Sequence, residues 1–146
     1  MSKFGCGCLG ILFLGLSFLI LASYAYYEWI WEEWPTERIE RVTGVRVPSY
    51  KIIETHKGNR VFTGDYEDSF EIEFRDMPSD ELFDEIDRII ANGNTGWKRV
   101  DNRYSFSVIW GNGLPAPKGE SEKSDRTFAI TILRGEKVGE IRSGTW

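Results

Sequence analysis

The chain has 146 residues, 28% of them charged, and a formal net charge of −5 at pH 7. This length suffices for one membrane segment and one small domain with its own core, and the acidic balance excludes the basic surface that nucleic-acid binding requires. Both cysteines, Cys6 and Cys8, lie near the start of the chain. The domain that follows therefore has neither a disulfide nor a thiol nucleophile.

Residues 4–27 contain no charged side chain and are mostly apolar. About 20 apolar residues in a helix cross the hydrocarbon core of a bilayer. We therefore predict a short cytoplasmic tail at residues 1–8, a transmembrane helix of the signal-anchor type at residues 9–27, and a juxtamembrane linker rich in aromatic and acidic residues at 28–35. An aromatic belt at the membrane interface is expected from Tyr24, Tyr26, Tyr27, Trp29, Trp31 and Trp34.

A cleaved signal peptide is the competing interpretation, because small residues at Ser23 and Ala25 fit a cleavage site after Ala25. The domain would then be secreted. We favour the anchor, because apolar and aromatic residues continue through the candidate cleavage site. Cys6 and Cys8 fit either acylation beside a membrane helix or, as we prefer, small residues at the interface.

The orientation follows from the basic residues around the apolar stretch. Lys3 precedes it, and a short basic tail ahead of a first helix usually stays in the cytoplasm. Arg38, Arg41 and Arg46 on the far side argue for the opposite orientation, but we assign them to a folded domain, and domains translocate largely regardless of charge. We predict a cytoplasmic N-terminus and a domain outside the cytoplasm.

The domain is expected to span residues 36–146 and to begin with a short helix at 36–43. Pro35 ends the membrane helix because it lacks an amide donor, Thr36 is expected to cap the new helix, and Gly44 to stop it. A strand is expected at 50–56. A returning strand is expected at 61–74, where Phe70, Ile72 and Phe74 alternate with charged residues.

The clearest helix follows the capping residue Ser79. Its apolar residues recur at helical spacing along one face, which predicts a helix that covers one side of a sheet. The turn Asn92-Gly93-Asn94 ends it. The apolar face consists of Leu82, Phe83, Ile86, Ile89 and Ile90.

In the rest of the chain, segments in which apolar residues recur at every second position are separated by turn residues. We expect strands at 97–100, 103–110, 126–134 and 137–142, and an exposed, mobile loop at 111–125 because that segment is rich in glycine, proline and charge. The fold class is therefore α+β: an antiparallel sheet of about five or six strands with one main amphipathic helix packed on one face.

Three segments merit a test for chemistry. A carboxylate cluster could attract a cation but lacks the spacing of a calcium loop, so we interpret it as a solvated strand face. Gly111-Asn112-Gly113 is not followed by a helix, so it is a turn and no dinucleotide site. His56 is the only histidine, and no motif positions a nucleophile beside it. The carboxylate cluster comprises Asp65, Glu67, Asp68, Glu71 and Glu73, with Tyr66 among them.

Aromatic residues of the domain alternate along the predicted strands, so we assign them to the core. Among them Trp110, beside the long loop, is the one to watch as a ligand or partner contact. The aromatic set is Trp97, Tyr104, Phe106, Trp110, Phe128 and Trp146.

These patterns predict no catalytic, cofactor or metal site. They favour a single-pass membrane protein whose domain binds another protein or an envelope component, with the lipid bilayer contacted through residues 9–27. The alternative is an anchored hydrolase or transferase that uses His56 and nearby carboxylates.

Overall fold

The computed structural model describes residues 15–22, 34–58, 65–93, 96–123 and 125–145. The chain forms two compact units, Met1–Glu33 and Trp34–Trp146. In the first unit residues 15–22 are helical and exposed. None of the helices in the described ranges combines the length and the apolar character that a membrane crossing needs. Most of the predicted membrane helix at 9–27 lies outside these ranges.

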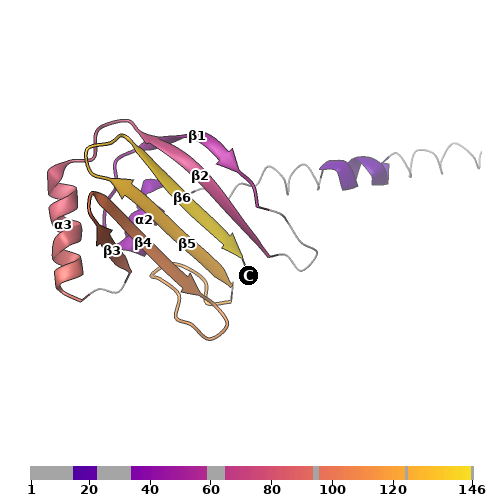
Figure 1. Cartoon of the computed structure of the whole chain (residues 1–146). Coiled ribbons are helices and arrows are strands. Elements are labelled where there is room, and N and C mark those ends of the chain that lie inside the picture. The colour runs from indigo at the N-terminus through magenta and orange to yellow at the C-terminus, as the bar shows by residue number, and fades with distance from the viewer. Residues whose placement is uncertain (1–14, 23–33, 59–64, 94–95, 124, 146) are drawn as a thin grey trace, which may run out of the picture. The chain divides into compact units, whose positions relative to one another are not determined.

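The second unit contains a six-stranded antiparallel sheet with the strand order β1-β2-β6-β5-β4-β3 (Figure 1). Helix α2 (Thr36–Thr43) precedes the sheet, and α3 (Asp80–Ala91) connects β2 to β3. The predicted α+β class, with an antiparallel sheet, is thereby confirmed. The strands are β1 (Tyr50–His56), β2 (Tyr66–Phe74), β3 (Trp97–Val100), β4 (Arg103–Trp110), β5 (Arg126–Leu133) and β6 (Val138–Thr145).

Strand β6 lies in the interior of the sheet, although it is last in the chain. It pairs antiparallel with β2 on one side and with β5 on the other. The predicted strand ended at residue 142, whereas β6 continues to Thr145 because residues 143–145 pair with both neighbours. Strands β1 and β3 are the two edge strands of the sheet.

The core lies on one face of the sheet, where alternate strand residues meet both helices. Ile39 of α2 and Phe83 and Ile86 of α3 are completely buried in the same cluster as the strand residues. Burying each such side chain contributes about 1.5–3 kcal/mol of hydrophobic free energy. The strand residues of this cluster include Phe70, Ile72, Phe74, Trp97, Tyr104, Phe106, Trp110, Phe128, Ile130, Ile132 and Ile141.

The helix ends follow local capping rules with one exception. The Ser79 hydroxyl accepts a hydrogen bond from the Leu82 amide at 3.4 Å, as predicted for the start of α3. Gly44 ends α2 in a left-handed conformation with φ 76°. The predicted cap at Thr36 is wrong, since Pro35 occupies the capping position and its carbonyl accepts from the Ile39 amide at 3.1 Å.

Trp34 belongs to the domain core and not to an interfacial belt. Its side chain is buried, and its ring centroid lies 4.0 Å from that of Phe128. The Tyr50 hydroxyl donates a hydrogen bond to the Trp34 carbonyl. The domain core therefore begins at Trp34, two residues before the predicted domain boundary at residue 36. The other residues of the predicted aromatic belt lie outside the described ranges.

The segment between β4 and β5 is held against α2. Arg38 donates from Nε to Glu120 Oε1 at 2.9 Å and from Nη2 to Oε2 at 2.7 Å. At its start, Gly111 and Leu114 form a bridge through reciprocal backbone hydrogen bonds, which confirms the predicted turn. The loop predicted as mobile is thus attached to the domain through Glu120, a contact that composition does not reveal.

Candidate functional site

The candidate site lies on the sheet face opposite the core. Figure 1 shows α2 behind the sheet and α3 beside β3, while the face toward the viewer carries no helix. We call this surface, over its described residues, the open face. Small residues such as Ser105, Ser107 and Ala129 occupy its middle, on β4 and β5. A sheet face with short side chains leaves room for a second molecule.

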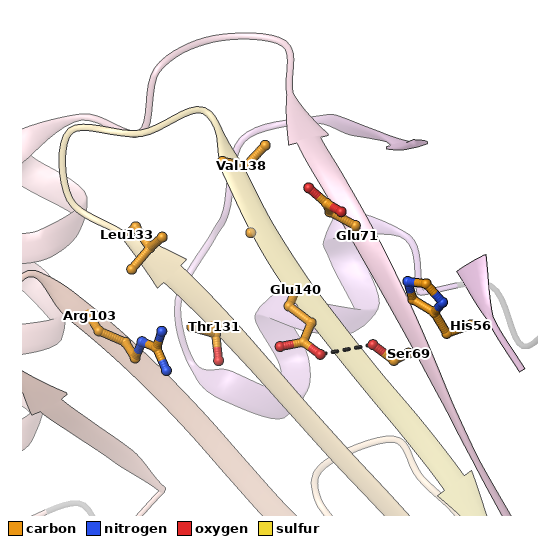
Figure 2. Close-up of a pocket in the computed structure, with 9 residues that line it drawn as sticks. His56, Ser69, Glu71, Arg103, Thr131, Leu133, Val138 and Glu140 are labelled. Atoms are coloured by element: carbon orange, nitrogen blue, oxygen red, sulfur yellow. Dashed lines mark hydrogen bonds between the residues drawn. The ribbon is translucent and has the colours of Figure 1, made fainter. Parts of the chain in front are cut away.

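A shallow depression of about 290 Å³ lies on the open face, and we call it the hollow. Its walls combine carboxylates, an imidazole, a guanidinium, hydroxyls and two aliphatic side chains (Figure 2). It is lined by His56, Ser69, Glu71, Arg103, Thr131, Leu133, Val138, Gly139 and Glu140.

The negative charge of Glu140, at the centre of the hollow, is already balanced by groups within the protein. Arg142 donates from Nε to Glu140 Oε1 at 2.8 Å and from Nη2 to Oε2 at 3.2 Å, and the Ser69 hydroxyl donates to Oε1 at 2.8 Å. Arg142 first, and Ser69 second, lower the pKa of Glu140, although burial acts in the opposite direction. Glu140 is therefore an ionised and satisfied carboxylate at neutral pH.

Three glutamates lie side by side across the open face. The register pairs Glu54 of β1 with Glu71 of β2, and Glu71 with Glu140 of β6. Directly opposite residues have Cβ atoms about 4.5–5.5 Å apart, and like charges in such positions destabilise a sheet. His56 Nε2 lies 3.4 Å from Glu54, and Arg142 pairs with Glu140. Within the described part of the chain, Glu71 has no ion-pair partner.

Arg103 stands on the other side of the hollow, on β4. Its Cα partner on the neighbouring strand β5 is Leu133. Figure 2 shows the Arg103 guanidinium reaching toward Thr131. Among the residues placed by the structure, no carboxylate forms an ion pair with Arg103. The hollow thus combines an anion on β2 and a cation on β4 that form no ion pair with a described residue, although Arg103 acts at longer range to lower the pKa of Glu140.

His56 and Ser69 are neighbours without forming a nucleophile and base pair. They are Cα partners in the β1–β2 ladder, and Figure 2 shows both beside the hollow. The Ser69 hydroxyl donates to Glu140, and His56 contacts Glu54. An activated serine needs its proton directed at a base. In this geometry the serine proton is directed at Glu140 and not at His56. Glu140 is a weak base, because Arg142 lowers its pKa.

The predicted carboxylate cluster does not converge on one point. Asp68 is buried and accepts a hydrogen bond from the Gly58 amide at 3.1 Å, whereas Glu71 and Glu73 lie on the open face. Lys51 lies 2.7 Å from Glu73 and, as the largest cause, lowers its pKa. Across the described ranges no group of histidine, cysteine, aspartate and glutamate is arranged to hold a metal ion.

Trp110 was the aromatic residue to watch as a ligand or partner contact, and the structure places it in the core. Its side chain is completely buried, with Trp97, Tyr104, Phe106 and Phe128 in the same core. The period-two spacing that assigned these residues to the core is confirmed, and it applies to Trp110 as well. Trp146 lies outside the described residues.

Sequence reasoning singled out His56 and Glu71 but missed the other polar residues of the hollow. Arg103, Thr131 and Glu140 lie on strands that are distant from β1 and β2 in the chain. Their alternation with apolar residues shows that they face away from the core. It does not show which strands become neighbours, so their grouping could not be read from the sequence.

The chain matches no protein-family model, no curated protein and no solved structure.

Proposed function

We propose that this chain is a membrane-anchored binding protein, whose domain recognises another protein or an envelope component through the open face, without catalysis. The observation that carries the proposal is the hollow, in which Glu71 and Arg103 lack partners among the described residues while the core face is occupied by α2 and α3. Unpaired charges on a recessed surface favour recognition of a complementary partner.

The arrangement of Ser69 supports binding over hydrolysis. Its hydroxyl donates to Glu140, whose pKa Arg142 lowers, so the carboxylate that accepts the serine hydrogen bond is a weak base. We therefore assign the hollow to recognition.

The location is proposed from the uncharged stretch at residues 4–27. We propose that residues 9–27 span the bilayer, with the N-terminus in the cytoplasm and the domain outside. Alkaline carbonate washing of membranes from the producing cells tests the anchor. Retention of the full-length chain in the pellet is expected, and release into the supernatant would contradict the proposal. Protease added outside intact cells should degrade the domain if the orientation is correct.

Site-specific photo-crosslinking in intact cells tests the binding surface. A photoreactive residue is placed at Ser107 or Ala129 on the open face, and at Asp84 or Glu85 on the exposed side of α3 as matched controls. We expect a discrete adduct from the open-face positions alone, and its loss when Thr131→Arg fills the hollow. Equal adducts from both surfaces, or an adduct indifferent to Thr131→Arg, would contradict the proposal.

A hydrolase or transferase that uses His56 is the second candidate, because His56 borders the same hollow as Ser69, Glu71 and Glu140. The substitution His56→Ala separates the two functions. Loss of a cellular activity at unchanged thermal stability would favour the enzyme, whereas retention favours binding. If cleavage after Ala25 releases a secreted domain instead, the measured intact mass will be that of a mature chain that begins at residue 26.

A further inference from the structure

The two unpaired charges of the hollow have opposite signs. Glu71 is a half-buried carboxylate on β2, and Arg103 is an exposed guanidinium on β4. No described residue forms an ion pair with either of them. Each is therefore available to a charge that a partner supplies.

These two residues are too far apart to neutralise one another. Strands β6 and β5 separate β2 from β4. The register places Arg103 two positions along β4 from Ser105, which lies in the row of Glu71, Glu140 and Thr131. With strands about 4.8 Å apart and residues about 3.3 Å apart, the two Cα atoms are on the order of 15 Å apart.

One charged side chain lies between them. It is Glu140, which Arg142 and Ser69 satisfy, and Arg103 adds an electrostatic attraction that helps to lower the pKa of Glu140. Leu133 and Val138 add aliphatic surface to the walls. An occupant that fits this surface therefore needs a cation at one end, an anion at the other, and an uncharged stretch between them.

We propose that the hollow takes an extended segment of a partner protein that carries a basic and an acidic side chain four positions apart. The basic side chain pairs with Glu71 and the acidic one with Arg103. In an extended segment residues four positions apart face the same side and lie about 13 Å from each other, close to the separation of the two charges. This inference rests on the proposed function, since it assumes that the open face is the binding surface.

Selection from a random twelve-residue peptide library, displayed on phage, tests the charge pattern. The bait is the full-length chain in phospholipid nanodiscs. We expect enriched peptides to contain a Lys or Arg and an Asp or Glu four positions apart. With Glu71→Gln as bait the basic position should lose its enrichment, and with Arg103→Gln the acidic position should lose it. A synthetic enriched peptide should bind each variant about fivefold more weakly, as expected for one solvent-accessible ion pair.

Lys98→Gln provides the matched control, because Lys98 also lies on the open face but does not line the hollow. Its selected peptides should match those of the unsubstituted chain. Enrichment of basic residues alone, enrichment that both substitutions leave unchanged, or no enrichment at all would overturn the inference. A dimer in sedimentation analysis that Glu71→Gln and Arg103→Gln both abolish would identify a second copy as the occupant, and would overturn it too.

The outcome is separable from that of the proposed function. Open-face crosslinks that Thr131→Arg abolishes, combined with a library that shows no mixed-charge pattern, would refute only this inference. Crosslinks that are equal on both surfaces would refute the proposed function itself.

Discussion

Arg38 of α2 and Glu120 of the β4–β5 loop form an ion pair with two hydrogen bonds of 2.9 and 2.7 Å. Only 18% of the Arg38 side chain and 10% of the Glu120 side chain are exposed. The Arg38 guanidinium also lies 3.9 Å from the ring centroid of Trp34. One residue of α2 thus connects the start of the domain to a loop that is distant in the sequence.

The substitution Glu120→Gln should destabilise the domain by roughly 1–3 kcal/mol, because it replaces a charged acceptor of a shielded guanidinium with a neutral amide. Urea denaturation of the full chain at pH 7, followed by far-UV circular dichroism in detergent, measures the change. The matched control is Glu122→Gln on the same loop, where Glu122 is exposed and makes no ion pair with a described residue. It should change the free energy of unfolding by less than about 0.5 kcal/mol. Equal effects of the two substitutions would show that the Arg38 contact contributes nothing.

Acid should weaken the domain through the same pair. Arg38 lowers the pKa of Glu120 below its ordinary value, with burial acting in the opposite direction. The unfolded chain therefore binds a proton at a higher pH than the folded one. The contribution is complete above the ordinary pKa of about 4.3 and is lost as the pH falls through the folded pKa. Denaturation midpoints between pH 6 and pH 3 should fall less steeply for Glu120→Gln than for the unsubstituted chain, and parallel profiles would contradict the prediction.

Removing the Trp34 ring should cost about 3–5 kcal/mol, the range for truncating a large buried aromatic side chain to alanine. Its stacking on Phe128 and its contact with Arg38 are lost together. Val100→Ala is the control, since Val100 is 67% exposed and should change stability little. If Trp34→Ala leaves the unfolding free energy unchanged and alters only membrane association, Trp34 acts at the interface and not in the core.

The substitution Gly144→Ala should destabilise the sheet by roughly 2 kcal/mol or more, because overpacking a close backbone contact forces the strands apart. A Cβ at this position would lie 2.1 Å from the Tyr66 carbonyl oxygen of β2. Ser107→Ala, on the exposed face of β4, is the control and should be nearly neutral. Amide hydrogen exchange should locate the loss of protection at the β2–β6 ladder. Unchanged exchange there would mean that the strands accommodate the methyl group.

The elements of the fold were predictable because each depends on neighbouring residues. The stripe from Leu82 to Ile90 has helical period, and the Ser79 hydroxyl begins α3 as its residue type implies. Alternation in β2 and β4 identified the buried apolar residues of both strands, whereas Asp68 of β2, assigned to a solvated face, is buried. Strand ends were less predictable, as β6 shows, because pairing with two neighbours extends it beyond the turn-defined segment.

The candidate site was only partly predictable. His56 and Glu71 were noted from residue type alone, and the alternation of β2 places Glu71 away from the core. Nothing in the local pattern connects them to Arg103, because β6 and β5 intervene between β2 and β4. Trp110 is the opposite case, since the period-two alternation of β4 already assigned it to the core, where it is buried.

The sequence by itself determined the class of the elements, the face that β2, β4 and β5 turn to the core and the uncharged stretch ahead of the domain, because periodicity and charge are local properties. The tertiary structure decided that β6 enters between β2 and β5, that Trp34 belongs to the core and that Glu71 and Arg103 share one hollow. Those outcomes depend on contacts between segments far apart in the chain. The strength of such contacts depends on how well two surfaces fit together, and no single segment encodes that fit.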